Sequence, residues 1–168
     1  MRAIFIRHAS AEAPGDGPDE ARKLTRAGKG EAKAAGLALK AIGVKLDRIL
    51  TSPLVRSVET AELVAAVQGK VKIEKVGFLG PPGDLRALRR RLVELQRDKV
   101  DYVALVGHTP IMEGFLGHIL IGRADVGISL PKAGAACLEL GENWPRGEVE
   151  LRWLLRRDQL ELLSRLEA

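Results

Sequence analysis

The sequence predicts a three-layer α/β/α fold, in which a mostly parallel sheet carries helices on both faces. Short apolar runs typical of buried strands alternate with longer segments of helical periodicity, and this order favours a parallel sheet. The last two apolar runs flank a short turn, which predicts an antiparallel late hairpin. A chain of 168 residues is long enough to bury roughly 70% of its unfolded surface. We therefore expect one domain over residues 1–168.

The predicted elements follow one another without repeats, linkers or low-complexity segments. The run DYVALVGH at 101–108 is nearly continuous in apolar residues, which predicts a central strand that is covered on both faces. In chain order we expect strand 3–8, helix 24–43, strand 47–52, helix 52–67, strand 71–76, helix 85–95, strand 101–108, helix 109–122, strands 134–140 and 149–155, and helix 156–166.

Local signals mark where the first two helices begin and end. The hydroxyl of Thr25 can cap the first helix, and Gly43 is a typical stop signal. For the second helix, Ser52 is the predicted N-cap and Pro53 the predicted first helical residue.

Composition limits the classes of function. The chain is 46% hydrophobic and 29% charged, as is ordinary for a globular protein, and no stretch approaches the ~20 apolar residues that span a bilayer. Cys137 is the only cysteine, so no internal disulfide can form. A strand directly after Met1 leaves no room for a signal peptide, and we expect a cytoplasmic protein.

A net charge of +5 favours anionic partners, which include phosphorylated substrates as well as nucleic acids. The arginines of LRALRRRL are better explained as the solvated face of a leucine-striped helix than as a nucleic-acid site, because no aromatic residues accompany them. His118 lies mid-helix among apolar residues and is interpreted as a packed side chain. We expect no nucleic acid and no membrane among the partners.

Basic and imidazole side chains follow three of the predicted strands. Arg7 and His8 end the first strand, Arg56 lies in the first turn after the second, and His108 ends the fourth. Each motif alone is compatible with a structural role. Because parallel strands end at one edge of a sheet, where ligands of open α/β folds bind, their joint occurrence predicts one pocket.

These groups suit a phosphoryl ligand. Guanidinium groups bind phosphate oxygens in pairs, and helix N-termini after Pro53 and Pro110 add N–H donors. The predicted phosphate-binding residues are Arg7, Arg56, His108 and Thr109. Such a pocket stabilises the charge that phosphoryl transfer develops.

A histidine nucleophile must be neutral, and two fixed positive charges should lower its pKa below the usual ~6.5. A histidine can then carry the phosphoryl group covalently. The chemistry needs no metal or other cofactor, and the sequence holds no carboxylate cluster that would bind a metal.

The segments IRHASAE, LTRAGKGEA, LTSPLVRSVETA and LVGHTP resemble the histidine phosphatase superfamily, most of all its small SixA-type phosphohistidine phosphatases. The resemblance implies a phosphoglycerate mutase-like fold, with His8 as phosphoryl acceptor and Arg7, Arg56 and His108 around the phosphate. One residue departs from the family pattern: Ala9 stands where the family has glycine. If that glycine needs a positive φ, alanine alters the loop; if it does not, little changes.

The length of the loop after the third predicted strand bears on the substrate. This Pro/Gly loop is brief, which leaves little material for a lid and favours a phosphohistidine that projects from a folded partner protein. A departing imidazole also needs a general acid far less than an alkoxide does. Asp84 is the candidate proton donor and equally a candidate helix cap, and Glu12 and Glu113 are weaker candidates.

We therefore expect a metal-independent phosphatase that hydrolyses phosphohistidine on a protein through a phosphoryl-His8 intermediate. The alternatives are a phosphomonoesterase or mutase that acts on small phosphate esters, and a non-catalytic anion-binding module. The site requires one chain only, which fits a monomer.

Overall fold

The computed structural model describes residues 1–167, in which six strands form one sheet with the order β3-β2-β4-β1-β5-β6. The strands are β1 (Arg2–Arg7), β2 (Arg48–Thr51), β3 (Lys72–Lys75), β4 (Tyr102–Gly107), β5 (Ala135–Leu140) and β6 (Val149–Leu155). The helices are α1 (Arg26–Ala41), α2 (Val55–Gln68), α3 (Leu85–Arg97), α4 (Ile111–Ile121) and α5 (Arg157–Ser164), with 3-10 turns at Asp19–Ala21, Gly77–Leu79 and Arg165–Glu167.

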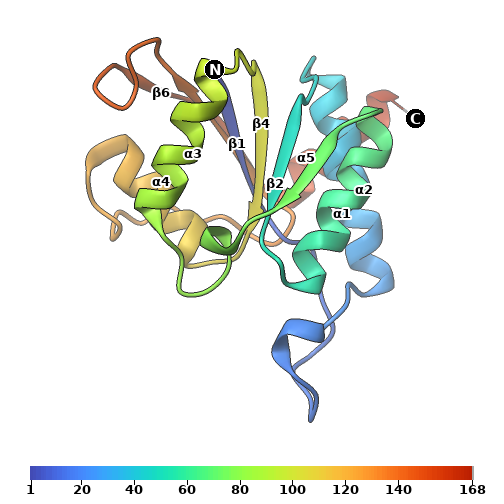
Figure 1. The fold of residues 1–168 in the computed structure, drawn as a ribbon. Helices are drawn as coiled ribbons and strands as arrows, with labels where there is room; N and C mark the ends of the chain where they lie inside the picture. Colours follow the sequence, from blue (N-terminus) through green and yellow to red (C-terminus); the bar gives the residue numbers. More distant parts are fainter. Residues whose placement is uncertain (168) are drawn as a thin grey trace.

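The first four strands are parallel, and at one edge β5 pairs antiparallel with β1 and β6 pairs antiparallel with β5. The mostly parallel sheet, the central position of β4 and the late hairpin are thus confirmed. Helices α3 and α4 cover one face of the sheet, and α1, α2 and α5 cover the other (Figure 1).

Alternating side chains of β1 divide the core between the two faces. Ala3 and Phe5 join a cluster with the leucines of α3 and with Met112 and Phe115 of α4. Ile4 and Ile6 pack on the opposite side against α1 and α2. A strand that is buried on both faces needs apolar residues at every position, which explains the unbroken run before Arg7.

Helix ends agree with the sequence at α1 and differ at α2. The Thr25 side chain accepts a hydrogen bond from Gly28 N, and Gly43 has a φ of 80° just past the helix. Helix α2 begins at Val55, after Leu54 as N-cap, so the predictions for Ser52 and Pro53 are wrong. Ser52 instead directly follows the end of β2, and its hydroxyl contacts the ring of His108.

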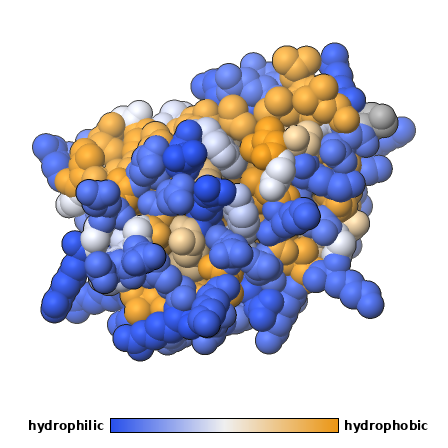
Figure 2. All heavy atoms as spheres, turned by 90° about the horizontal axis from the view of Figure 1, so that it is seen from above, coloured by the Kyte–Doolittle hydropathy of each residue, from blue (hydrophilic) through white to orange (hydrophobic). Residues whose placement is uncertain are grey.

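No helix among the described residues is long and apolar enough to cross a membrane. Figure 2 views the molecule from the top of Figure 1, which is the amino end of the parallel strands, and hydrophilic side chains cover most of this face. The chain segment that leads from β1 to α1 extends beyond the opposite edge, at the carboxyl ends of the strands (Figure 1).

Candidate active site

Two histidines meet at the carboxyl ends of the neighbouring strands β1 and β4. The parallel register pairs Arg7 with Gly107, so that His8 and His108 leave the sheet side by side. Their ring centroids are 5.0 Å apart and the rings are inclined by 56°. Both residues are buried, with 7% and 5% of their surface exposed. The structure thus brings together two residues that are separated by a hundred positions in the sequence.

The His8 ring is neutral and has one defined free nitrogen. Its Nδ1 lies 2.8 Å from the carbonyl oxygen of Ala9, which can only accept, so Nδ1 carries the proton and Nε2 keeps its lone pair. Burial, with smaller contributions from the charges of Arg56 and Arg7, lowers the pKa of His8 to about 4. The direction agrees with the sequence, but burial rather than the arginine charges is the largest cause.

His108 is held by two hydroxyl groups. Its Nε2 lies 2.7 Å from the Ser52 hydroxyl and 3.3 Å from that of Ser57, at the start of α2. Burial, followed by the neighbouring His8 and Arg56, lowers the pKa of His108 to about 3. Its Nδ1 is buried and has no hydrogen-bond partner within residues 1–167. A buried nitrogen of this kind is available to form a hydrogen bond with a bound ligand.

The two predicted arginines lie at the same edge, and only some of the N–H groups of each guanidinium have hydrogen-bond partners. Arg7 Nη1 donates to the Leu130 carbonyl at 3.1 Å, and its Nε is buried without a partner among the described residues. Arg56 is 5% exposed. Its terminal nitrogens donate to the Asp19 carbonyl at 2.7 Å and to the Asp19 carboxylate at 2.9 Å, and its Nε has no partner in the same part of the chain.

Asp19 and Arg22 are site residues that the sequence reasoning missed. Both belong to the segment between β1 and α1, and Arg22 Nε donates to Asp19 Oδ1 at 2.7 Å. Hydrogen bonds from Arg22 and Arg56 lower the pKa of Asp19 below its usual range. The segment therefore brings one carboxylate into contact with a predicted phosphate-binding arginine. An acid and a base three residues apart in PDEAR are the only local signal, and that spacing is common on protein surfaces.

Hydrogen bonds to side chains of α1 and α2 hold the loop after His8. Ala9 is fully buried and its N–H donates to Thr60 Oγ1 at 3.2 Å. Ser10 donates through its N–H and its hydroxyl to the buried Glu31 carboxylate, at 2.8 and 3.0 Å. Among the described non-glycine residues only Lys99 and Ala133 have positive φ, so Ala9 adopts a backbone conformation that alanine accepts without strain.

The candidate proton donors and Thr109 differ in their exposure and in their hydrogen bonds. Asp84 is exposed and caps α3, because its carboxylate accepts from Ala87 N at 3.0 Å. Glu12 is exposed and accepts from Lys23 N, whereas Glu113 accepts from Leu130 N at 2.8 Å and acts electrostatically on Arg7. Thr109 is half-buried on the link from β4 to α4. Within residues 1–167 no group of three or more His, Cys, Asp or Glu residues is placed to hold a metal ion.

Comparison with known protein sequences adds three findings. Residues 3–79 match the family model of the histidine phosphatase superfamily (branch 1). Phosphohistidine phosphatase SixA of Escherichia coli is 30% identical over 117 residues, which cover 69% of this chain and 71% of that protein. An uncharacterized protein of Picosynechococcus sp. is 32% identical over 142 residues, which cover 84% of this chain and 86% of that protein.

A solved structure of the protein histidine phosphatase SixA complexed with tungstate superimposes with a TM-score of 0.85. The match has 24% sequence identity and covers 95% of this chain and 99% of the SixA chain. At this identity the superposition establishes a common fold.

Proposed function

This chain belongs to the histidine phosphatase superfamily as a SixA-like phosphatase, and from this membership we propose that it removes phosphoryl groups from phosphohistidine on a partner protein. Its fold is the phosphoglycerate mutase-like fold of that family. The proposal names His8 as the phosphoryl acceptor and Arg7, Arg56 and His108 as the groups around the phosphate, with Thr109 at its edge. It requires no metal or other cofactor.

One observation carries the proposal. Two neutral histidines lie 5.0 Å apart at one sheet edge, each with a ring nitrogen that makes no hydrogen bond within residues 1–167, beside arginines that keep a buried unpaired Nε. Buried polar groups normally have hydrogen-bond partners, so unpaired nitrogens on side chains that share one sheet edge support the binding of a tetrahedral anion at that edge. Positive charge and neutral nitrogen are the features that a phosphoryl acceptor site requires.

In the first proposed step His8 Nε2 attacks the phosphorus atom of the substrate. A new N–P bond forms to His8, the N–P bond to the substrate imidazole breaks, and the departing imidazole takes a proton from solvent water. Arg7, Arg56 and His108 stabilise the equatorial oxygens as this happens. Breaking one imidazole–phosphorus bond while making another is close to an even exchange, so that positioning alone can supply much of the rate.

In the second proposed step a water molecule attacks phosphoryl-His8. The N–P bond to His8 breaks, inorganic phosphate leaves, and the neutral ring with its proton on Nδ1 is restored. The Ala9 carbonyl holds that proton throughout, which keeps Nε2 as the reacting nitrogen in both steps.

The substrate class is supported by the relative and by the residues near the site. The name of the Escherichia coli relative describes a phosphohistidine phosphatase. Asp84, the strongest candidate acid for an ester substrate, is exposed and already caps α3. An imidazole leaving group can depart without such an acid, because protonated imidazole has a pKa of only ~6.5.

Turnover by one preparation tests the proposal. A protein that carries phosphohistidine and a panel of small phosphate esters are compared at equal concentration, and the proposal expects kcat/KM at least tenfold higher for the phosphohistidine protein. Higher turnover of esters, together with its collapse in Asp84→Asn, would establish the alternative of a phosphomonoesterase or mutase.

Trapping of the intermediate tests the mechanism. Rapid quenching should yield acid-labile, alkali-stable phosphate on the wild-type protein and none on His8→Ala. Equal labelling of the two proteins would remove His8 from its proposed role. If neither is labelled and no substrate turns over, the chain is an anion-binding module without catalytic activity.

Three further expectations belong to the same proposal: one domain over residues 1–168, a monomeric site and a cytoplasmic location. The site residues all come from one chain, and the single cysteine, Cys137, is buried in β5, where burial raises its pKa to about 11. A buried thiol of this kind is protected from oxidants and fits a reducing compartment without requiring one.

A further inference from the structure

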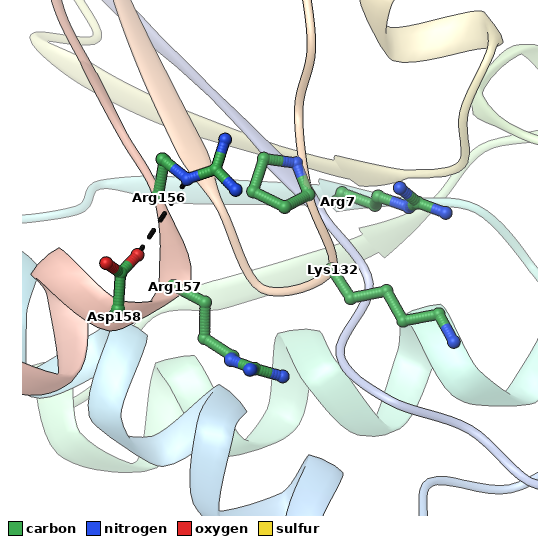
Figure 3. Close-up of a pocket in the computed structure, with 6 residues that line it drawn as sticks. Arg7, Lys132, Arg156, Arg157 and Asp158 are labelled. Atoms are coloured by element: carbon green, nitrogen blue, oxygen red, sulfur yellow. Dashed lines mark ion pairs between the residues drawn. The ribbon is translucent and has the colours of Figure 1, made fainter.

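A basic pocket opens beside Arg7, the residue that precedes His8 (Figure 3). It has a volume of about 400 Å³ and is lined by Arg7, Pro131, Lys132, Arg156, Arg157 and Asp158. Arg7 comes from the end of β1, Lys132 from the turn before β5, and the other charged residues from the start of α5. Four of the six lining residues are cations and one is an anion, so the pocket favours a negatively charged ligand.

Two of the cations are free to meet such a ligand. Lys132 is exposed and forms no ion pair within residues 1–167. Arg156 reaches Asp158 only at 3.9 Å, with both side chains more than half exposed, and such a pair contributes little. Arg157 is already engaged, because it contacts Glu31 at 3.0 Å and Glu161 at 3.5 Å. Lys132 and Arg156 are therefore the available charges.

The backbone turn that carries Lys132 is held against the segment of the proposed nucleophile. The turn that carries it is closed by a hydrogen bond from Gly134 N to the Pro131 carbonyl at 2.8 Å. The next residue, Ala133, donates its N–H to the carbonyls of Arg7 and His8, at 3.2 and 3.3 Å. The Lys132 charge also contributes to the lowered pKa of His8. The turn that carries Lys132 is thus hydrogen-bonded to the segment that carries Arg7 and His8.

We propose that Lys132 and Arg156 bind carboxylates on the surface of the partner protein that surround its phosphohistidine, while the phosphoryl group itself lies between His8 and His108. The inference rests on the proposed function and adds the charge character of the partner. Both side chains are exposed to solvent. Exposed cations suit contact with a protein surface better than binding of a small ligand, because small ligands are usually enclosed in concave sites. Complementary charge of this kind acts mainly on the association rate and weakens as salt screens it.

The test compares two substrates in each variant: a phosphorylated histidine-containing phosphotransfer domain with an acidic surface, and free phosphohistidine. The quantity measured is the ratio of their kcat/KM values. Charge reversal by Lys132→Glu with Arg156→Glu should lower this ratio at least fivefold at low salt. Neutralisation by Lys132→Gln with Arg156→Gln should lower it less, and 0.5 M salt should reduce the wild-type ratio on the order of the same factor.

A matched control carries the same change in net charge elsewhere. Lys72 at the amino end of β3 and Arg97 at the end of α3 are exposed and lie away from the site, so Lys72→Glu with Arg97→Glu should keep the wild-type ratio. A ratio that is unchanged in the pocket variants, equally lowered in the control, or insensitive to salt would overturn the inference. So would a wild-type protein that shows no preference for the phosphotransfer domain. If the wild type hydrolyses neither substrate, it is the proposed function that fails.

Discussion

At the scale of single residues, the protonation of the histidine pair is the property on which the proposed chemistry depends. His8 and His108 have pKa values of about 4 and about 3, well below the ~6.5 of an exposed imidazole. Both rings are therefore neutral throughout the neutral range. Because burial is the largest cause, the lowered pKa values belong to the folded protein and return to the usual range on unfolding.

The pH dependence of stability follows from these shifts. Between about pH 6.5 and pH 4 the unfolded chain binds protons on these two rings and the folded protein does not, so the free energy of unfolding should fall as pH falls through this window. Each histidine can contribute up to about 1.4 kcal/mol per pH unit. Urea unfolding at pH 7.0, 6.0 and 5.0 measures the slope. His8→Gln should lower it, and an equal slope in the variant would contradict the assignment.

Asp19 presents a carboxylate to Arg56 where a phosphate oxygen is expected to bind. Removing its charge while keeping its size, as in Asp19→Asn, should strengthen the binding of inorganic phosphate or tungstate. A change on the order of fivefold, or about 1 kcal/mol, is expected for one unit charge several ångströms away in a partly screened site. Isothermal titration measures it. Weaker binding in the variant would mean that orienting Arg56 is the larger effect of Asp19.

At the scale of elements, the close approach of α1 to the loop after β1 positions His8, the proposed nucleophile. Gly28 lies in the first turn of α1, where a Cβ atom would come within 1.9 Å of the Ser10 carbonyl oxygen. Helix α1 can approach this closely only because Gly28 has no side chain. The same helix supplies Glu31, whose carboxylate accepts hydrogen bonds from the N–H and the hydroxyl of Ser10.

Gly28→Ala should therefore push α1 away from the His8 loop. We expect a loss of more than about 2 kcal/mol in the free energy of unfolding and a clear loss of phosphatase activity. Gly30→Ala is the matched control in the same helix, because a Cβ there meets nothing within 4 Å. The control should raise stability by about 0.5–1 kcal/mol and leave activity unchanged. Chemical denaturation of both variants checks the pair, and similar values would exclude the close contact as the cause.

At the scale of the whole molecule, the site exists only where β1, β2 and β4 end together. An anion that contacts groups from all three strand ends should link these parts and stabilise the fold. Binding to the native state alone adds about 2.7 kcal/mol when the ligand is at a hundred times its dissociation constant. Tungstate should therefore raise the melting temperature of the wild-type protein in a concentration-dependent way.

Variants of either arginine should reduce this effect. Arg7→Gln and Arg56→Gln remove groups from different strand ends, and each should lower the thermal shift at a given tungstate concentration by more than half. Arg97→Gln, on an exposed helix end, serves as the control and should keep it. Thermal scans with and without tungstate provide the measurement. A shift that survives in both Arg7→Gln and Arg56→Gln would place the anion elsewhere.

Features with a local cause were predictable from the sequence. Strands that are buried on both faces need apolar residues at their buried positions, as β1 has at residues 3–6 and β4 at residues 103–106. The hydroxyl of Thr25 caps α1 as its position suggests. The strand-end rule then places His8, Arg56 and His108 at one edge without any coordinates. What this rule predicts is a shared edge, and the 5.0 Å separation of the rings comes from the structure.

Features that arise between distant segments were not predictable. Asp19 meets Arg56 across 37 positions, and neither residue has a periodic pattern that would indicate the other. Ser52 has the residue type and position of a helix cap, yet its hydroxyl contacts His108 across 56 positions. Charge alone likewise could not separate Lys132 and Arg156 from the other cations of a basic chain.

The sequence by itself determined the layers of the fold, the strand ends and the chemical types that gather there, because burial and backbone geometry act over a few neighbouring residues. Only the tertiary structure decided which hydroxyl groups contact His108, which carboxylate forms an ion pair with Arg56 and which cations lie beside Arg7. The physical reason is that hydrogen bonds and charge pairs depend on distances of a few ångströms between segments, and those distances are set when the two faces of the sheet are packed.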